Sequence, residues 1–432
     1  MKKTTTTKTN KPTLISNLAL LATLATCSVQ ATDGYFSHGY GIKAKGRAGV
    51  ALTETDDAFG GANNPAALTW ADNQLNLGID WFRPDRSAER TGPAKPFNAR
   101  VVSDSRDFFI PEIAYKRAFG KEFSLGISIY GNGGMNTDYS GGQLNLGPGA
   151  TSQNLLAGSG HLGVNLSQLL IAPTVAWKFA ENHSIGLAPI LAYQTFKAYG
   201  LQAFSPLSQD ATALSNVGND YSFGGGARLG YLWKVTPDVS LGAAYSSRVY
   251  TSRFDKYRGL FAGNGSFDIP QSVGVGIGWQ ALPALRLGVD YKWIDYASIA
   301  AVGNPSSNAG QLGQEHGPGF GWRSISTVKV GADWQVTKAL TFRAGYGFSE
   351  NPVQARDVTF NILAPAVVQH HLTFGATYDF GRHDISVFYL HAFENSVTGE
   401  SKFVALGKAP AGTRETIAMS QDSIGIAYSY KF

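Results

Sequence analysis

Thiols, charged residues and long apolar runs are all scarce in this sequence. The 432 residues include one cysteine, Cys27, and only 16 % of them are charged. No stretch reaches the roughly 18 consecutive apolar residues that a membrane-spanning helix needs. A disulfide-stapled fold and a helical membrane protein are therefore excluded, which leaves a secreted soluble protein or a closed β-barrel.

The formal charge of +5 gives little support to nucleic-acid binding. Residues 1–31 contain four lysines and no acidic residue, and the remaining chain carries 32 basic and 31 acidic side chains. Nucleic-acid binding usually needs a clustered basic face. We expect no nucleic-acid partner.

Catalytic and metal-binding motifs are also missing. The chain has no HExxH motif, paired-cysteine site, nucleotide-binding loop or GxSxG nucleophile motif. The one adjacent histidine pair, His370-His371, points to opposite faces if it lies on a strand. We therefore expect no metal, no cofactor and no enzymatic activity, with an outer-membrane hydrolase as a weaker alternative.

The first 31 residues are typical of a secretory signal peptide. Lysines precede an apolar stretch from Leu14 to Ala25, and Val29-Gln30-Ala31 offers small residues at the usual cleavage spacing. Thr32 would then begin the mature chain. Leu24-Ala25-Thr26-Cys27 is close to a lipoprotein pattern, so lipidation of Cys27 is the alternative.

Gly and aromatic residues are abundant, and apolar residues recur with period two. The chain has 51 Gly, 25 Phe, 19 Tyr and 8 Trp. In one example, Leu285, Leu287, Val289, Tyr291 and Trp293 alternate with Arg286, Gly288, Asp290 and Lys292. The polar positions of such segments are rich in Gly, Ser and Thr, whereas the outer faces of soluble sandwiches usually carry more charge. This pattern predicts strands with a lipid face and a luminal face.

About fourteen such segments predict an all-β fold, namely a transmembrane antiparallel β-barrel. They lie near 74–83, 106–116, 122–131, 170–179, 183–197, 220–234, 238–250, 266–280, 284–295, 322–336, 340–349, 367–380, 383–394 and 420–432. Short and long connections alternate between them, as expected for short periplasmic turns and long external loops. The barrel domain would cover residues 74–432.

Aromatic residues near the ends of these strands indicate a bacterial outer membrane. Trp177, Trp233, Trp279 and Trp334 lie beside short turns, and Trp81 and Trp293 lie beside long loops. Indole rings favour the membrane interface, so these positions predict two aromatic belts. The last residue is Phe432, which is typical of outer-membrane barrels. We expect outer-membrane lipid and lipopolysaccharide as neighbours, and the barrel-assembly machinery as a partner during biogenesis.

Residues 32–73 precede the first strand and are too polar and Gly-rich to form a strand pair alone. A segment of this length could fold back and fill the barrel. The alternative is a disordered periplasmic tail.

Short motifs in this segment resemble the FadL-type family of outer-membrane transporters for hydrophobic compounds. The matching residues are Gly46-Arg47-Ala48, Asp56-Asp57-Ala58, Asn64-Pro65-Ala66 and the run from Gly131 to Tyr139. The resemblance implies a fourteen-stranded barrel with an N-terminal hatch at 32–73, to which Asn64, Pro65 and Ala66 would belong. It also implies a kink in the third strand, here 122–131, through which the ligand leaves laterally.

The resemblance leaves the ligand open between long-chain fatty acids and aromatic hydrocarbons. The start of the mature chain, Asp33 to Gly41, is aromatic and polar rather than plainly apolar, which departs from the fatty acid branch. If the ligand is a fatty acid, its carboxylate needs a cationic partner. Inward-facing candidates are Arg228, Arg286, Lys329 and Arg343. Alternatively, these could pair with the inward Asp290, Asp333 and Asp379.

The connection predicted at 132–169 offers a capture surface for apolar ligand. It contains Leu144, Leu146, Leu155, Leu156, Leu162, Val164 and Leu166. These could line an external groove or simply pack within the loop. The leading hypothesis is a channel for uptake of hydrophobic molecules with a mobile hatch, and a general porin or an adhesin barrel is the alternative.

Overall fold

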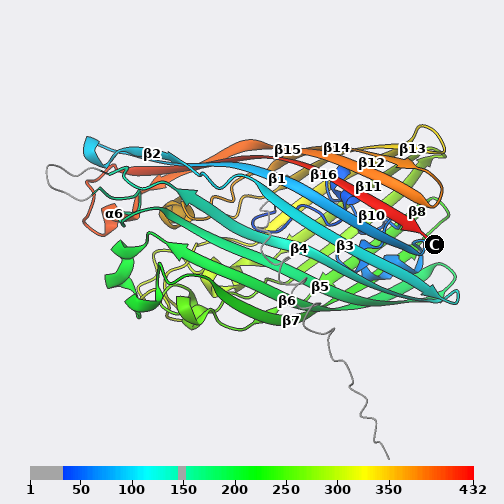
Figure 1. Cartoon of the computed structure of the whole chain (residues 1–432), viewed down its shortest axis with the longest axis horizontal. Coiled ribbons are helices and arrows are strands. Elements are labelled where there is room, and N and C mark those ends of the chain that lie inside the picture. The colour runs from blue at the N-terminus through cyan, green and yellow to red at the C-terminus, as the bar shows by residue number, and fades with distance from the viewer. Residues whose placement is uncertain (1–32, 145–151) are drawn as a thin grey trace, which may run out of the picture.

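A closed antiparallel barrel of fourteen strands makes up most of the computed structural model (Figure 1). The structure describes residues 33–144 and 152–432, so the signal peptide predicted at 1–31 and Cys27 lie outside the described residues. The first and last strands close the barrel, in a register that runs from Gln74↔Lys431 to Thr91↔Arg414. Closure leaves no open sheet edge, which is the condition for crossing a bilayer with strands. The all-β barrel expected from the alternation is confirmed.

Each barrel strand pairs with its neighbours in the chain. The strands are β1 (Gln74–Thr91), β3 (Phe108–Phe119), β4 (Phe123–Tyr139), β5 (Leu162–Ala180), β6 (His183–Tyr199), β7 (Asp220–Lys234), β8 (Val239–Ser246), β10 (Ser272–Leu282), β11 (Leu285–Ile294), β12 (Ile325–Gln335), β13 (Leu340–Ser349), β14 (His370–Asp379), β15 (His383–Glu400) and β16 (Arg414–Lys431). Two short strands, β2 (Ala99–Val102) and β9 (Tyr250–Thr251), pair with β1 and β7 outside this ring.

Helices are short and lie before or between the strands. They are the α-helices α2 (Ile42–Gly46), α3 (Ala262–Gly265), α4 (Ala300–Gly303), α5 (Val358–Asn361) and α6 (Lys402–Ala405), and the 3₁₀ helices η1 (Phe59–Gly61), η2 (Pro65–Thr69), η3 (Lys95–Phe97), η4 (Gln202–Leu207), η5 (Ala211–Ala213), η6 (Asp255–Tyr257), η7 (Tyr296–Ser298) and η8 (Ala355–Asp357). Within 33–144 and 152–432, no helix has the length and apolar character needed to cross a membrane.

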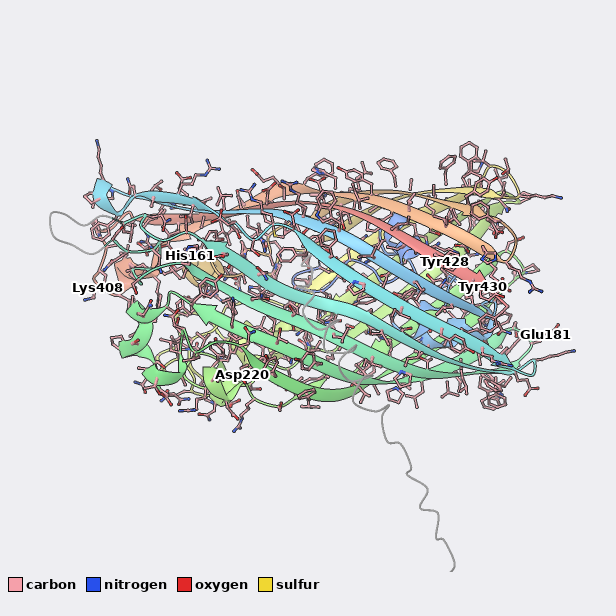
Figure 2. The ribbon with its side chains drawn as sticks, viewed as in Figure 1. His161, Glu181, Asp220, Lys408, Tyr428 and Tyr430 are labelled. Carbon is pink, nitrogen blue, oxygen red and sulfur yellow. The ribbon has the colours of Figure 1, made fainter. Side chains whose placement is uncertain are left out.

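The two ends of the barrel carry connections of different length. The long connections gather at the left end of Figure 1, and the short turns lie at the right end together with the C-terminus. In Figure 2, His161, Asp220 and Lys408 mark the long-loop end and Glu181 marks the short-turn end. The alternation of short and long connections expected from the sequence is therefore present around the whole ring.

Several strands are longer than their predicted segments. β1 and β4 continue past positions 83 and 131, and β5 begins at Leu162 rather than near 170. Consequently Leu162, Val164 and Leu166 belong to a strand, not to a loop, and Trp81 lies within β1 rather than at its end. A membrane crossing needs only about 9–11 residues per strand, so these extensions continue the barrel beyond the bilayer, where the apolar alternation that marked the strands is weaker.

Outward and inward faces differ as the alternation predicted. Large apolar side chains such as Val275, Trp279 and Trp334 are 50–55 % exposed on the outer surface. Inward positions carry polar or small residues, among them Asp80, Glu112 and Asp384, which are almost completely buried. Burial of charged groups inside a membrane barrel requires partners in the lumen.

Residues 33–73, the luminal segment, supply those partners. Its ribbon, dark blue in Figure 1, lies within the barrel, and its first residues are buried. Its α2 and η2 contact the inner faces of strands on opposite sides of the ring, β13 to β16 and β4 to β7. The segment therefore fills the lumen rather than hanging free as a tail.

Candidate functional site

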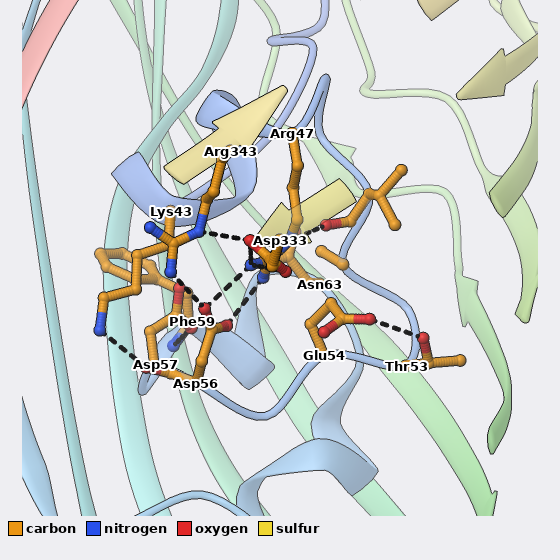
Figure 3. A network of polar contacts seen from close by, with 12 residues as sticks. Lys43, Arg47, Thr53, Glu54, Asp56, Asp57, Phe59, Asn63, Asp333 and Arg343 are labelled. Atoms are coloured by element: carbon orange, nitrogen blue, oxygen red, sulfur yellow. Dashed lines mark hydrogen bonds and ion pairs between the residues drawn. The ribbon is translucent and has the colours of Figure 1, made fainter. Parts of the chain in front are cut away.

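Ion pairs hold the first half of the luminal segment against the barrel wall (Figure 3). Arg47 of the segment pairs with its own Asp56 at 2.7 Å and with Asp333 of β12 at 3.1 Å. Arg343 of β13 joins the same cluster through Asp333 at 2.6 Å and Asp56 at 3.3 Å. The two motifs that contain Arg47 and Asp56 thus meet in one network with the wall.

Further pairs cross from the segment to other strands. Lys43 reaches Asp384 at 3.0 Å, and Lys45 lies between Asp80 at 2.9 Å and Glu112 at 3.2 Å. Truncating one partner of such a buried pair leaves an uncompensated charge, which typically costs about 3–5 kcal/mol. These contacts therefore fix the position of α2 strongly.

The Asn64-Pro65-Ala66 motif builds the second anchored part of the segment. The Asn64 side chain caps η2 by accepting a hydrogen bond from the backbone N–H of Ala66, and its amide donates to the carbonyl oxygen of Tyr231 on β7 at 3.0 Å. Pro65 starts the helix without needing a hydrogen-bond partner. Gly230 faces this turn so closely that a Cβ there would overlap the Asn64 side chain. The motif therefore combines a helix cap with close packing on the wall.

The first residues of the segment, 33–41, form its tip and are held by a different set of contacts. Asp33 pairs with Lys329 of β12 at 2.6 Å and accepts a hydrogen bond from Ser349 of β13 at 2.6 Å. Burial alone would raise the pKa of Asp33, but the ammonium of Lys329 outweighs it and the pKa falls to about 2. The Asp33 carboxylate is thus ionised at neutral pH.

Aromatic rings enclose the next two residues of the tip. The Tyr35 ring lies 5.0 Å from that of Tyr296 and 5.9 Å from that of Trp322, and Phe36 lies 5.6 Å from Tyr296. Tyr35 also contacts Phe267, at 6.0 Å between ring centres. Tyr35 and Phe36 therefore form an aromatic layer with rings from the connections between β8 and β10 and between β11 and β12.

The tip is tied to an irregular point in β4. The register between β4 and β5 shifts between Gly131 and Gly133, which leaves Asn132 as a bulge. Phe36 bridges to Gly133, and the backbone N–H of Ser37 donates to the carbonyl oxygen of Asn132 at 2.8 Å. β4 is the third strand of the barrel ring. Residues 131–134, which follow the predicted end of the third strand, therefore lie inside β4, and the bulge at Asn132 binds the tip.

An apolar pocket lies on the long-loop side of this aromatic layer. It encloses about 540 Å³, including the part open to solvent, and its walls include Leu156, Phe196, Phe204, Phe261 and Phe320. Phe261 contacts Phe267, and Phe320 contacts Trp322. The pocket therefore ends on the rings that surround Tyr35.

A second, more polar pocket lies on the other side of the tip. It encloses about 580 Å³ including open space, between the tip and the walls of β7, β8, β10, β11 and β12. Three cations, Arg228, Lys292 and Lys329, line it together with Asp290. The Lys292 ammonium lies 5.2 Å from the centre of the Phe36 ring.

The four cations proposed from the sequence as carboxylate partners are already engaged by the luminal segment. Arg228 donates to the carbonyl oxygen of Gly61 at 2.8 Å, and Arg286 pairs with Glu54 at 2.7 Å. Lys329 pairs with Asp33, and Arg343 with Asp56 and Asp333. The pairing with an inward aspartate considered for Arg343 is present, and a role of these four in ligand binding stays a prediction.

The leucines proposed for ligand capture are divided by the structure. Leu156 lines the apolar pocket, whereas Leu144 and Leu155 are buried and do not line it. Leu146 lies outside the described residues. Most of the pocket comes from other long connections, including residues 201–214, 260–261 and 312–320. Sequence reasoning missed these because loop residues carry no periodicity that places them in space.

Lys292 was also missed as a site residue, although the alternation of 285–293 places it on the inner face. Within the described part of the chain, no carboxylate or hydrogen-bond acceptor contacts its ammonium, while the neighbouring Arg228 and Lys329 have partners. Lys292 could not be singled out from the sequence, because the sequence does not show where the luminal segment lies. The segment provides partners for Arg228 and Lys329 and leaves Lys292 facing the polar pocket. No group of three or more potential metal ligands occurs among the described residues.

These features define an outer-membrane barrel with an apolar pocket on one side of an aromatic layer in the lumen. The family model described as outer membrane protein transport protein (OMPP1/FadL/TodX) matches residues 18–432, and the chain belongs to this family. It is thus an outer-membrane channel for hydrophobic small molecules.

Solved structures share this fold at low sequence identity. The toluene transporter TodX of Pseudomonas putida is 17 % identical, with a TM-score of 0.66 over 91 % of this chain and 99 % of that one. A FadL homologue of Pseudomonas aeruginosa is 16 % identical, with a TM-score of 0.66 over 92 % and 100 %. The toluene transporter TbuX of Ralstonia pickettii is 18 % identical, with a TM-score of 0.61 over 91 % and 99 %. No curated protein sequence matches the chain.

Proposed function

We propose that the luminal segment is a hatch whose tip, not whose body, moves during uptake. The tip is held by one ion pair, by ring contacts and by hydrogen bonds to β4, β12, β13 and Tyr296. By contrast, α2 and η2 each contact four strands, and α2 adds the buried ion pairs of Lys43 and Lys45. The observation that carries this proposal is the position of Tyr35 and Phe36 between the apolar pocket and the polar pocket.

Capture begins in the apolar pocket among the long loops. Each ~100 Å² of apolar ligand surface removed from water contributes about 2.5 kcal/mol, enough to draw a hydrocarbon from dilute solution. The pocket walls are almost entirely aliphatic and aromatic side chains. The ligand is carried without chemical change.

Release takes place laterally at the bulge in β4. Displacement of Phe36 and Ser37 would free Gly133 and Asn132, which now pair with the tip. At such a bulge the wall is not continuously hydrogen-bonded, so an opening towards the bilayer costs less there than along a continuously paired stretch of the ring. The ligand then passes into a phase in which it is soluble, beside outer-membrane lipid and lipopolysaccharide.

Lys292 favours ligands that combine an apolar body with a carboxylate, such as fatty acids. An ammonium without an anionic partner in a confined pocket is destabilising, and a carboxylate would compensate it. A neutral aromatic hydrocarbon offers this group only the weaker attraction between an ammonium and a ring face. The neighbours TodX and TbuX are named for toluene, so the polar pocket is the place where this chain would differ in preference.

Uptake of labelled oleate and toluene by cells with and without the protein tests the function. Equal uptake in both strains, for both compounds, would contradict transport. Lys292→Met keeps the length of the side chain and removes the charge. It should lower oleate uptake by about 10-fold, which is the typical contribution of a charged hydrogen bond, and change toluene uptake much less. An equal fall for both compounds would contradict the carboxylate assignment while leaving transport intact.

A further inference from the structure

Three buried side-chain amides form a continuous row across β4, β5 and β6. The Asn132 amide donates to the side-chain oxygen of Gln168 at 2.9 Å, and the Gln168 amide donates to that of Gln194 at 2.7 Å. All three residues are at most 1 % exposed. We call Asn132, Gln168 and Gln194 the amide row.

One end of the row holds the tip. The Tyr40 hydroxyl donates to the Asn132 side-chain oxygen at 2.8 Å, and Ser37 donates from its backbone to the Asn132 carbonyl oxygen. Tyr40 also packs on Tyr130 of β4, with ring centres 4.5 Å apart. The first amide of the row is therefore both the bulge of β4 and the anchor of residues 37–40.

The other end reaches the wall of the apolar pocket. The Gln194 amide donates to the carbonyl oxygen of Phe267 at 3.0 Å. The Phe267 ring contacts Phe261, a pocket residue, at 4.9 Å, and Phe261 contacts Phe196 of β6 at 4.6 Å. A ligand that displaces Phe261 would therefore move Phe267 and its carbonyl group.

All four bonds of this chain run in the same direction, from the Tyr40 hydroxyl to the Phe267 carbonyl. Each amide has one neighbour as acceptor and the other as donor, so breaking one bond leaves a buried group unsatisfied and disturbs the next. Apolar side chains would fill the same space, but their packing would not make one contact depend on the next. The row can therefore transmit a change at Phe267 to Tyr40, which simple packing would not do.

We infer that the amide row couples occupancy of the apolar pocket to release of the tip at the bulge of β4. This inference rests on the proposed function, since it concerns how captured ligand promotes its own passage. Ligand that displaces Phe261 moves Phe267 and withdraws its carbonyl acceptor from Gln194. The row then shifts, and Asn132 loses its bond to Tyr40. Couplings of this kind typically change a site equilibrium by about 5- to 150-fold.

A thiol placed on the tip measures this release. The Ser37→Cys variant of the full chain is reconstituted in lipid nanodiscs. Ser37 is only 4 % exposed, so a thiol at this position reacts with maleimide when the tip opens. Oleate and toluene serve as probes. We expect saturating probe to raise the labelling rate by at least 5-fold in the Ser37→Cys background, within the range typical of site coupling.

The Gln168→Leu substitution interrupts the row at its centre but also removes a polar neighbour of the Tyr35 hydroxyl in the tip. Gln194→Leu is therefore made beside it, because the Gln194 amide bonds to Gln168 and Phe267 and not to the tip. We expect each variant to abolish the probe-dependent rise while retaining probe binding. Gln421→Leu is the matched control, because Gln421 is an inward amide of β16 that is 1 % exposed and outside the row. Assembly of each variant is judged by heat-modifiable migration, and Gln194→Leu decides the test if the two row variants differ.

The outcomes separate the inference from the function. A probe-dependent rise that survives Gln194→Leu, or that is lost equally in Gln421→Leu, overturns the coupling role. Absence of any rise in the Ser37→Cys background also overturns it. Cellular uptake of the same probes stays an independent test, so coupling can fail while transport stands.

Discussion

Asp57 shows how one residue of the luminal segment makes its stability depend on pH. Its carboxylate lies next to Asp56 in the chain and accepts the backbone N–H of Phe59 at 2.8 Å. Burial, and then the charge of Asp56, raise the pKa of Asp57 to about 7. The folded state therefore favours the protonated form, so the contribution of Asp57 to stability is full below about pH 4 and is lost as the pH rises towards 7.

Asp57→Asn should remove this pH dependence, because the amide keeps the shape and cannot ionise. Limited proteolysis of the luminal segment in the assembled barrel is the measurement, at pH 5 and pH 8. The ratio of the cleavage rate at pH 8 to that at pH 5 should be larger for the parent than for the variant, because the two share every other titrating group of the segment, including the buried His38. A variant with the same pH dependence as the parent would show that another group is responsible.

The ion pairs of the segment show what sequence can predict at this scale. Alternation placed Arg286, Lys329 and Arg343 on the inner face of the barrel, where they are found. Their partners Glu54, Asp33 and Asp56 are more than 200 residues away in the chain. Nothing in the local pattern specifies such a pairing, because it depends on how the segment is threaded through the lumen.

At the scale of elements, β4 combines a bulge with a backbone contact to the tip at the same place. Gly133 permits this contact, because a Cβ there would overlap the carbonyl oxygen of Tyr35. Gly133→Ala should therefore expel the tip from its seat and open the closure. We expect faster uptake of labelled oleate and greater sensitivity of cells to hydrophobic dyes, each by several-fold.

Gly225→Ala in β7 is the matched control for this prediction. The nearest atom to a Cβ at that position is the carbonyl oxygen of Ile190, at an ordinary 3.7 Å. Assembly of both variants is checked by heat-modifiable migration. If Gly133→Ala lowers uptake while it assembles normally, the tip is needed for passage and does not merely close the lumen.

Strand positions were predictable because lipid outside and a packed lumen inside impose a strict period of two. Strand ends were less so, and β1, β4 and β5 extend well past the predicted segments. Beyond the bilayer both faces contact loops or water, and the constraint that produced the signal is gone. The bulge at Asn132 could not be predicted either. The glycines around it allow many backbone conformations, but they do not specify where the register shifts.

At the scale of the whole molecule, carboxylates of the wall pair with cations of the luminal segment, and cations of the wall pair with its carboxylates. The inward Asp80, Glu112 and Asp384 bind lysines of the segment. Conversely, Arg286, Lys329 and Arg343 bind its carboxylates. The segment therefore completes the electrostatics of the lumen, and the barrel without it would have an inner surface of uncompensated charges that water must solvate.

Deletion of residues 33–73 should convert this channel into a water-filled pore. The barrel closes through β1 and β16, and no strand of the ring comes from the deleted segment, so assembly should persist with a lower unfolding temperature. The exposed inner charges would attract water and ions, as in general porins of similar architecture. In planar bilayers we expect steady single-channel conductance from the deletion variant and at least 10-fold less from the parent. The same deletion should abolish the preference between oleate and toluene, because the polar pocket loses its tip-side wall. A parent that conducts as well as the variant would mean that the segment does not seal the lumen, and the protein would then act as an open porin.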